Sequence, residues 1–300
     1  GGCAGRHVGS GRKIVRNISL FEADRLTLED SLDLSVASLA AYGDRYRHWA
    51  IAYSGGKDST FQLHVLTKIY GMRALAVTFS HTWFSETGKY NLQNCLEKFD
   101  VDHVMFSPSR SLVNRLAHQS LHKIGDACWH CHAGVGAFPM QIAVRYKIPL
   151  LIWGESIAET SGRATHRDPV RKFDREYFTK VSAKRYPEEM VNEHISLREL
   201  AGFRLPSVEE IEKVGVVGIH LGDFIFWDDE RQMEFVRDVY DWREDKVEGT
   251  YKNYKSVECK MAGVHDYTKF LKRGFGRGTD HASVDVRAGL LTREEAFELA

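Results

Sequence analysis

A short run of small and charged residues near position 55 is the part of this sequence best suited to bind an anion. The run consists of Ser54, Gly55, Gly56, Lys57, Asp58 and Ser59. Adjacent glycines let the backbone approach a ligand closely, and unpaired N–H groups at the start of the helical pattern that follows attract negative charge. Serine hydroxyls and a lysine ammonium group add donors for phosphate oxygens. We therefore predict that this run binds nucleotide phosphates, with Lys57 and Asp58 acting in catalysis and Asp58 also holding Mg²⁺.

The spacing of this run differs from that of the most common phosphate-binding loop. That loop has four residues between its first glycine and a Gly-Lys-Ser or Gly-Lys-Thr sequence, and no glycine stands at that distance before Lys57. A glycine-rich turn without a ligand is the alternative interpretation. The serines at both ends and the charged pair inside favour nucleotide binding, and the run resembles the loop of the PP-loop ATPases, also called ATP pyrophosphatases.

The resemblance to the PP-loop ATPases implies both a chemistry and a fold. In that superfamily the loop holds the β- and γ-phosphates of ATP, and attack on the α-phosphate adenylates a carbonyl oxygen. Displacement of AMP then introduces nitrogen or sulfur. The resemblance implies a parallel five-stranded sheet, with ATP lying across the carboxyl ends of the strands. This placement agrees with the general rule for ligands of open α/β sheets.

A second group of reactive side chains is found among the five cysteines. Cys128 and Cys131 have the spacing of one half of a zinc site. A closed site needs two further ligands, for which His132, Cys95 and Cys259 are candidates. The thiols are also suited to carry persulfide sulfur, and buried cysteines at a helix start are the remaining interpretation. Because an odd number of scattered cysteines is a poor disulfide framework, we expect reduced thiols and a cytoplasmic protein.

Two carboxylates and one arginine are further candidates for the active site. Glu155 follows an apolar segment, where it would hold Mg²⁺ or position a substrate amide; a solvated loop carboxylate is the alternative. Arg277 is suited to bind phosphate through two parallel hydrogen bonds. Asp280 would coordinate Mg²⁺ or orient the acceptor, or else cap a helix that begins near His281. We predict catalytic roles for Glu155 and Asp280, and a role in nucleotide binding for Arg277.

A basic stretch after position 160 is suited to hold the diphosphate of a sugar nucleotide. It contains Arg163, His166, Arg167, Arg171 and Lys172. A solvated charged face is the alternative interpretation of this stretch.

Short apolar segments alternate with helical patterns around the phosphate-binding run. The expected strands are 49–53, 74–79, 101–106 and 149–153, and the expected helices are 60–70, 87–99, 109–123 and 134–146. Strands that alternate with helices of about 10–15 residues imply a parallel sheet covered by helices on both faces. The predicted class is therefore α/β.

The remaining chain is expected to be mainly helical. The patterns predict helices over 27–41, 196–214 (interrupted at Pro206), 230–243 and 264–273, a strand region over 216–227, and a capping box over 292–295 that starts a final helix. We expect a helical lead-in over 1–45, a PP-loop core over 46–156, a charged insertion or substrate region over 157–215, and a segment over 216–300 that completes the core and adds C-terminal helices. Because the chain lacks an initiator methionine and stops within a helical pattern, we expect a fragment.

The composition argues against several classes of protein. Hydrophobic residues make up 43% and charged residues 27%, as in folded globular domains. Lys plus Arg and Asp plus Glu both number 41, and a net charge of +0 disfavours broad binding to nucleic acid. No apolar run approaches the roughly 20 residues that span a bilayer, and no apolar signal core precedes position 20. We expect neither a membrane nor a nucleic acid as partner.

Four longer strings of residues, found in the same order, point to one branch of the superfamily. They are NLQNC at 91–95, GDACWHCH at 125–132, IPLLIWGE at 148–155 and GRGTDHAS at 276–283. Together they resemble the N-acetyl sugar amidotransferases of surface-polysaccharide (LPS/O-antigen) biosynthesis. The resemblance implies conversion of an acetamido group on a nucleotide-linked sugar, such as a UDP-N-acetyl sugar, to an acetamidino group. It also implies ATP and Mg²⁺ as cofactors, and a separate class I glutaminase that supplies ammonia.

Residues before the phosphate-binding run resemble a different branch. Sugar amidotransferases of this kind begin with paired cysteines, whereas only Cys3 precedes the run. The sequence 45–59 is more similar to proteins of the phosphoadenosine-phosphosulfate-reductase type. A sulfur-handling enzyme, which would thiolate tRNA or reduce a sulfonucleotide, is therefore the first alternative. A catalytically inactive nucleotide-binding subunit that scaffolds a partner is the second.

Overall fold

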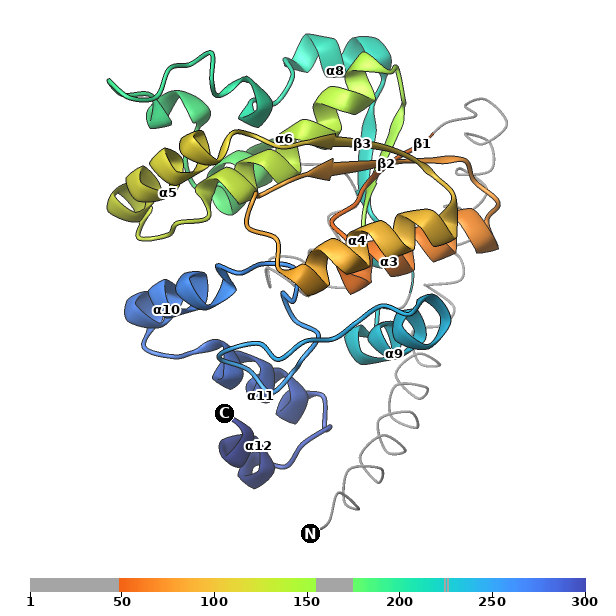
Figure 1. The fold of residues 1–300 in the computed structure, drawn as a ribbon, viewed down its shortest axis with the longest axis vertical. Coiled ribbons are helices and arrows are strands. Elements are labelled where there is room, and N and C mark those ends of the chain that lie inside the picture. Colours follow the sequence, from red (N-terminus) through yellow and green to blue (C-terminus); the bar gives the residue numbers. More distant parts are fainter. Residues whose placement is uncertain (1–48, 155–174, 224, 226) are drawn as a thin grey trace.

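The computed structural model describes residues 49–154, 175–223, 225 and 227–300, and this part of the chain contains five strands (Figure 1). They are β1 (Trp49–Ala52), β2 (Ala74–Phe79), β3 (Asp102–Phe106), β4 (Leu150–Trp153) and β5 (Val217–His220). The strands form one sheet in the order β3-β2-β1-β4-β5. Every neighbouring pair is parallel. The α/β class predicted from the alternating pattern is therefore confirmed.

Helices connect the strands and make up most of the C-terminal part. The α-helices are α3 (Lys57–His64), α4 (Glu86–Phe99), α5 (Arg110–Ile124), α6 (Trp129–Arg145), α8 (Val208–Val214), α9 (Asp229–Tyr240), α10 (Ala262–Arg273), α11 (Arg277–Arg287) and α12 (Arg293–Leu299). Shorter turns of π- or 3₁₀-helix are η1 (Val65–Ile69), η2 (Tyr177–Ser182), η3 (Pro187–Met190), η4 (Ala201–Phe203) and η5 (Leu221–Asp223).

Side chains of the sheet alternate between two hydrophobic cores. Ala76 and Ile152 belong to the core that α3, α4 and α9 cover, whereas Val77 and Leu151 belong to the core that α5 and α6 cover. Successive side chains of a strand point to opposite faces, so neighbouring apolar residues can fill both cores. Figure 1 shows the two helical layers on opposite sides of the strands. The predicted covering of both faces is confirmed.

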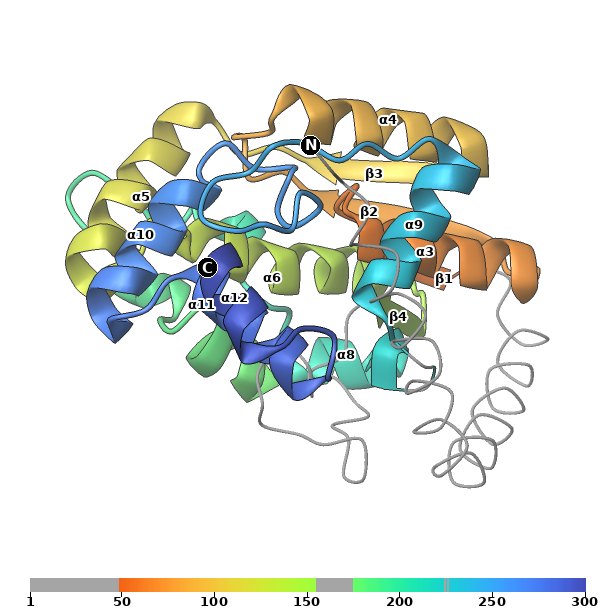
Figure 2. The ribbon, with the colours of Figure 1, turned by 90° about the horizontal axis from the view of Figure 1, so that it is seen from below.

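The C-terminal helices extend the side of the molecule that carries α4 and α9. In Figure 1, α10, α11 and α12 lie below the sheet on that side, and Figure 2 shows α10 beside α5. The connection between α9 and α10 is attached to the start of α4. Phe84 and Cys259 form an isolated bridge there, and the backbone N–H of Ser85 donates to the carbonyl of Glu258 at 2.9 Å. This attachment brings residues of the last third of the chain next to the central strands.

Three element boundaries differ from the expected ones in ways that matter for the site. Helix α3 begins at Lys57 instead of near position 60, so the lysine belongs to the first helical turn. Helix α6 begins at Trp129, five residues before the expected start at 134, and Cys128 is its N-cap residue. Helix α11 begins at Arg277 with Gly276 as its N-cap, so the prediction that Asp280 caps a helix is wrong. Local propensity places helix ends poorly, because it does not see tertiary contacts.

The predicted helix over 196–214 is largely wrong. The structure has turns, the short η4 and then α8, which covers only residues 208–214. Ser196 instead starts a turn that Glu199 closes by accepting hydrogen bonds from its N–H and hydroxyl groups. Pro206 lacks the N–H that a continuing helix needs, and Ser207 then caps α8. Among the described residues of the strand region expected over 216–227, β5 is the only strand, and η5 follows it. The predicted helix over 27–41 lies outside the described residues.

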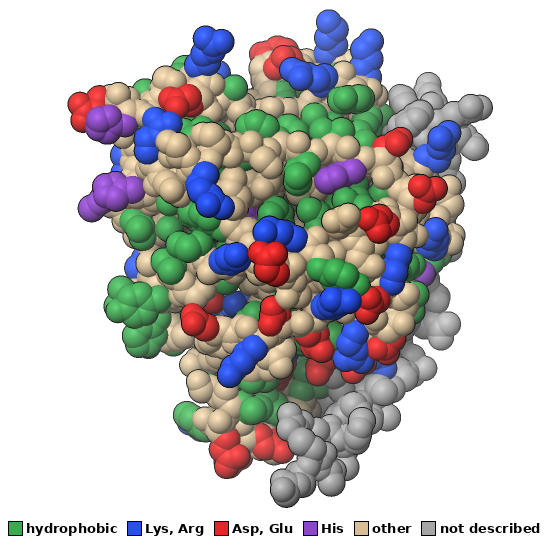
Figure 3. All heavy atoms as spheres, in the orientation of Figure 1, with side chains coloured by type: hydrophobic (Ala, Val, Ile, Leu, Met, Phe, Trp, Pro, Cys, Tyr) green, Lys and Arg blue, Asp and Glu red, His purple; other side chains and the backbone are tan. Residues whose placement is uncertain are grey.

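The surface shows mixed charge. On the face in Figure 3, Lys and Arg side chains are interspersed with Asp and Glu, so this face carries no broad field of one sign. Over the described part of the chain, no helix combines the length and the apolar character needed to cross a bilayer. The last helix begins as predicted, because Thr292 and Glu295 form the expected capping box at the start of α12.

Candidate functional site

The phosphate-binding run lies at the carboxyl end of the central strand. β1 ends at Ala52, and α3 begins at Lys57. Since β1 lies between β2 and β4, the chain continues to one side of it through β2 and β3 and to the other through β4 and β5. Open α/β sheets bind ligands at the crevice where the strand order changes direction in this way. The topology therefore places the run where a nucleotide site is expected.

Glycine is required at position 55 by both backbone geometry and space. Gly55 has a φ of +80°, and a Cβ atom there would lie 2.9 Å from the Cα of Leu92 on α4. Its carbonyl accepts a hydrogen bond of 3.0 Å from the buried indole Nε1 of Trp242. Contacts with α4 and with the residues after α9 thus fix the position of Gly55 in the phosphate-binding run.

The two serines of the run contact each other. Their hydroxyl oxygens are 3.2 Å apart, and Ser59 Oγ also accepts from the backbone N–H of Ser54 at 3.2 Å. Ser54 Oγ in turn accepts from the N–H of Gly56 at 3.3 Å. These bonds close the loop over the N-terminus of α3. In this arrangement the serines shape the loop, and hydrogen bonds from Ser54 and Ser59 to phosphate remain a prediction.

Lys57 is held by two carboxylates. Its side chain is only 3% exposed, and its Nζ lies 2.5 Å from Asp58 Oδ1 and 2.6 Å from Asp229 Oδ1 at the first turn of α9. Lys255 pairs with the other oxygen of Asp229. The two ammonium groups lie 5.8 and 5.6 Å from the centre of the Tyr254 ring. Two cations thus converge beside the loop, one from α3 and one from the segment between α9 and α10.

The lysines also control the charge of Asp58. Partial burial raises the pKa of this carboxyl group, but the ammonium groups of Lys57 and Lys255 and hydrogen bonds together hold the pKa below its usual value. Asp58 is therefore a carboxylate at neutral pH, as an Mg²⁺ ligand must be. The magnesium role itself remains a prediction.

Glu258 lies between the loop and the C-terminal helices. Burial raises its pKa, whereas the charges of Arg277 and Lys57 lower it and that of Asp58 raises it further. Its backbone packs so closely on α4 that a Cβ atom on Gly88 would lie 2.5 Å from the Cα of Glu258. The sequence analysis missed Glu258, Asp229 and Lys255, because nothing local marks residues so far along the chain as neighbours of the loop.

Arg277 and Asp280 point into the C-terminal part itself. The guanidinium group of Arg277 is buried and donates to Asp266 at 3.0 Å and to Ser256 at 2.8 Å. Asp280 pairs with Lys269. Among the described contacts, neither residue bonds to the phosphate-binding run. Their roles in nucleotide binding and catalysis therefore remain predictions, and Glu155 and the basic stretch from Arg163 lie outside the described residues.

The partly buried imidazole of His281 is neutral. Burial, together with the positive charges of Lys255 and Arg277, lowers its pKa to about 3. Its Nδ1 lies 2.7 Å from the hydroxyl oxygen of Thr250.

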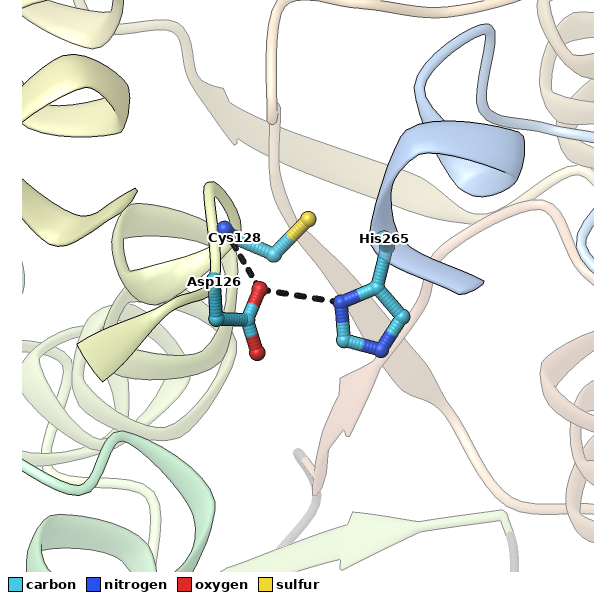
Figure 4. A group of neighbouring side chains, drawn as sticks. All are labelled: Asp126, Cys128 and His265. Atoms are coloured by element: carbon cyan, nitrogen blue, oxygen red, sulfur yellow. Dashed lines mark hydrogen bonds and ion pairs between the residues drawn. The ribbon is translucent and has the colours of Figure 1, made fainter. Parts of the chain in front are cut away.

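Cys128 belongs to a second cluster of potential ligands. Figure 4 shows its thiol beside Asp126, which precedes α6, and His265, which projects from α10. Asp126 Oδ1 accepts from the N–H of Cys128 at 3.0 Å and lies 2.9 Å from Nδ1 of His265. Its Oδ2 accepts from Lys184 at 3.0 Å. One ligand atom from each of Asp126, Cys128 and His265 lies within 4.8 Å of the others.

Two further thiols are close to this cluster. Burial raises the pKa of Cys131 well above its usual value, and the thiols of Cys128 and Cys259 raise it further. Burial likewise raises the pKa of Cys128 to about 12 and that of Cys259 to about 11. All three are therefore neutral thiols at pH 7 unless a cation is bound. Cys95 lies elsewhere, in the core that also contains Tyr53.

The two clusters are joined by one short segment. Residues 254–259 carry Tyr254, Lys255 and Glu258 toward the phosphate-binding run, and end at Cys259 beside the thiols. A separate cavity of about 1060 Å³ opens at the amino ends of the strands, where Met72, Asp102 and Ile148 line it. That cavity is at the opposite edge of the sheet from the run, away from the edge at which open α/β sheets bind ligands.

The C-terminal segment matches a known family. Residues 248–300 match the model described as "LPS biosynthesis protein WbpG-like, C-terminal domain". The match confirms the resemblance to proteins of surface-polysaccharide biosynthesis that the ordered strings indicated. The matched residues include Lys255, Glu258 and His265 of the second cluster, whereas Asp229 lies before the match.

Similar solved structures include two from other organisms. One is a predicted subunit of tRNA methyltransferase from Methanocaldococcus jannaschii, with 15% identity and a TM-score of 0.34, covering 64% of this chain and 75% of that one. The other is the NMN synthetase of Francisella tularensis, with 12% identity and a TM-score of 0.31, covering 64% of this chain and 92% of that one. No curated protein matches this chain.

Proposed function

We propose that this protein is an ATP-dependent amidotransferase that acts on the acetamido group of a nucleotide-linked N-acetyl sugar. The proposal rests on one observation: a segment that matches the WbpG-like C-terminal domain brings Lys255 to Asp229, the same carboxylate that holds Lys57 of the phosphate-binding run. A segment similar to a family of LPS biosynthesis and a candidate phosphate-binding run thus meet at one place, as we expect of an enzyme that adenylates a sugar substituent.

The residues around the loop suit the triphosphate of ATP. The N-terminus of α3 offers unpaired N–H groups, and Lys57 and Lys255 offer two cations. Phosphate oxygens would replace the carboxylates as partners of the lysines. Asp58 and Asp229 would then be free to hold Mg²⁺, whose preferred ligands are oxygens. Bound Mg²⁺ would neutralise the charge that develops on pyrophosphate.

The proposed reaction proceeds in two steps. First, the acetamido oxygen attacks the α-phosphorus and pyrophosphate leaves, which makes the acyl carbon electrophilic. Next, ammonia adds to that carbon, AMP leaves with the former carbonyl oxygen, and a proton goes to solvent. The protein's contribution is to orient the phosphates and stabilise their charge, which is often the largest part of catalysis. In this scheme, ammonia comes from a class I glutaminase partner.

The direct test is to incubate the purified protein with ATP, ammonium and UDP-N-acetyl sugars. We expect AMP and pyrophosphate to form only when a sugar is present, and oxygen-18 from a labelled acetamido group to appear in AMP. Glutamine should replace ammonium only when a glutaminase is added. Sugar-independent AMP release, or AMP without the label, would rule out this reaction.

A variant of the loop lysine tests the assignment of the site. Lys57→Met should lower the rate of AMP formation by roughly 100-fold or more, because a charge next to the phosphates is lost. Lys68→Met on η1, whose side chain is exposed, is the matched control and should be fully active. Equal activity of the two variants in a single-turnover assay would contradict the assignment.

Sulfur transfer is a second candidate function, because one segment joins the thiol cluster to the phosphate-binding run. A thiolate is the nucleophile in such chemistry, and the raised pKa of each of the three thiols opposes it. The same assay with sulfide in place of ammonium separates the two candidates. Faster AMP formation with sulfide, lost in Cys128→Ser, would favour sulfur transfer.

A further inference from the structure

We propose that Asp126, Cys128 and His265 bind a zinc ion that fastens the C-terminal segment to the core. The three side chains come from two distant parts of the sequence, yet their ligand atoms lie within 4.8 Å of one another. Figure 4 shows them directed toward a common point. This site goes beyond the proposed function, since no step of that reaction needs it.

The spacing of the ligand atoms is close to that of a zinc site. Zinc bonds to oxygen and nitrogen of about 2.0 Å at a tetrahedral angle hold the two atoms about 3.3 Å apart. Asp126 Oδ1 and His265 Nδ1 are 2.9 Å apart. A movement of a few tenths of an ångström would therefore admit the ion between them. Cys128 would bind through its sulfur and release its proton to solvent.

The kinds of ligand favour zinc over magnesium or calcium. Mg²⁺ and Ca²⁺ prefer oxygen ligands alone, whereas zinc accepts a mixture of sulfur, nitrogen and oxygen. Lys184 donates to the second oxygen of Asp126 at 3.0 Å and would fix the orientation of that ligand. Cys131 is three residues beyond Cys128, and the charges of Cys128 and Cys259 both affect its thiol, so Cys131 and Cys259 are the candidates for the fourth position.

The consequence of the ion would be to position residues of the active site. His265 is six residues beyond Cys259, and the segment that ends at Cys259 carries Lys255 and Glu258 to the phosphate-binding run. An ion shared between α10 and the loop before α6 would hold this segment in place. Folding energy from structural zinc is large enough to do so.

The test measures zinc in the whole 300-residue chain, purified under reducing conditions without chelator. We expect elemental analysis to find about one zinc ion per chain. The zinc content of Cys128→Ser and of His265→Gln should be lower by at least about tenfold. Cobalt substituted for zinc should show thiolate-to-metal absorption that Cys128→Ser lacks. Chelation should lower the melting temperature of the wild-type chain but not that of the two variants.

Cys95→Ser is the matched control, because the Cys95 thiol is buried in the core that α3, α4 and α9 cover. This variant should keep its zinc. Circular dichroism shows whether Cys128→Ser and His265→Gln are folded. If one of them is unfolded, Asp126→Asn is measured in its place. Wild-type protein without bound zinc would overturn the proposal. Retention of zinc by folded Cys128→Ser and His265→Gln, or iron with inorganic sulfide in place of zinc, would overturn it as well.

Discussion

At the scale of single residues, the site is built around one shared carboxylate. Asp229 binds Lys57 from α3 and Lys255 from the segment before α10. A lysine that is 3% exposed is unfavourable without partners, and Asp58 and Asp229 provide them. A triphosphate offers stronger acceptors than these carboxylates. In the proposed function, the lysine pair would exchange carboxylate for phosphate when ATP binds.

The first prediction concerns Lys255. Lys255→Ala should raise the Kd for a non-hydrolysable ATP analogue about 10-fold to 100-fold, because a hydrogen bond between charged groups contributes about 1.5–3 kcal/mol. Titration calorimetry measures the change. The side chain of Lys260, which also precedes α10, is exposed. The control variant Lys260→Ala should therefore bind the analogue as the wild type does. Unchanged affinity in Lys255→Ala would show that phosphate does not reach this lysine.

At the scale of elements, the loop depends on how closely α4 packs against it. The N-terminal half of α4 touches Gly55 through Leu92 and the segment before α10 through Gly88, which packs on Glu258. The string NLQNC at 91–95 lies on this helix. Its Asn91 accepts from the N–H of Arg243 and donates to the carbonyl of the same residue, both at 2.8 Å. The helix thus organises both sides of the candidate site.

The second prediction compares two glycines with positive φ. Gly71→Ala meets no atom within 4 Å, so it should cost about 1 kcal/mol of unfolding free energy from backbone strain alone. Gly55→Ala adds a clash with Leu92 and should cost a further 1–3 kcal/mol, roughly. Urea denaturation measures both values. Gly55→Ala should also lose ATP binding, whereas Gly71→Ala should keep it. Equal losses of unfolding free energy in the two variants would show that α4 moves to accommodate the added methyl group.

At the scale of the whole molecule, the C-terminal part completes a site that begins in the central strand. In Figure 1, α3 and α4 lie below the sheet, and α11 and α12 lie further below. A buried histidine, His81, lies where the sheet meets the start of α4. Burial lowers the pKa of His81, just after β2, to about 4, and its ring packs against Phe84 with centroids 4.4 Å apart.

The third prediction is that acid destabilises the fold through such histidines. The folded pKa of His81 is near 4 and the unfolded value near 6.5, so the unfolded chain binds more protons between these pH values. Stability therefore falls as the pH drops from 6.5 toward 4. His81 alone should account for a loss of about 2 kcal/mol between pH 7 and pH 5.

Urea denaturation at the two pH values checks this loss. His81→Gln should reduce it by about that amount, because glutamine does not titrate. His118→Gln, at an exposed position on α5, should leave the loss unchanged. An equal pH dependence in the wild type and His81→Gln would show that this histidine is not responsible.

Much of the fold was accessible to sequence patterns, because it depends on local and periodic features. The alternation of apolar segments and amphipathic helices predicts the α/β class, and β2 covers the predicted residues 74–79. Patterns failed over 196–214, where Ser196 and Pro206 favour turns over helix. They also placed the start of α6 too late, at 134, because nothing local in residues 129–133 marks a helix start. Gly134 and Gly136 instead fit closely against Phe79 and Phe178, which is a tertiary contact.

The phosphate-binding run follows from the sequence by itself, because its glycines, lysine and aspartate are contiguous and act through a strand, a turn and a helix start. The tertiary structure alone decided what surrounds it. Asp229, Lys255 and Glu258 reach the run only because the chain returns after β5 and attaches to α4. The same return brings His265 to Asp126 and Cys128. Contacts between such distant residues depend on three-dimensional packing, which no local pattern encodes.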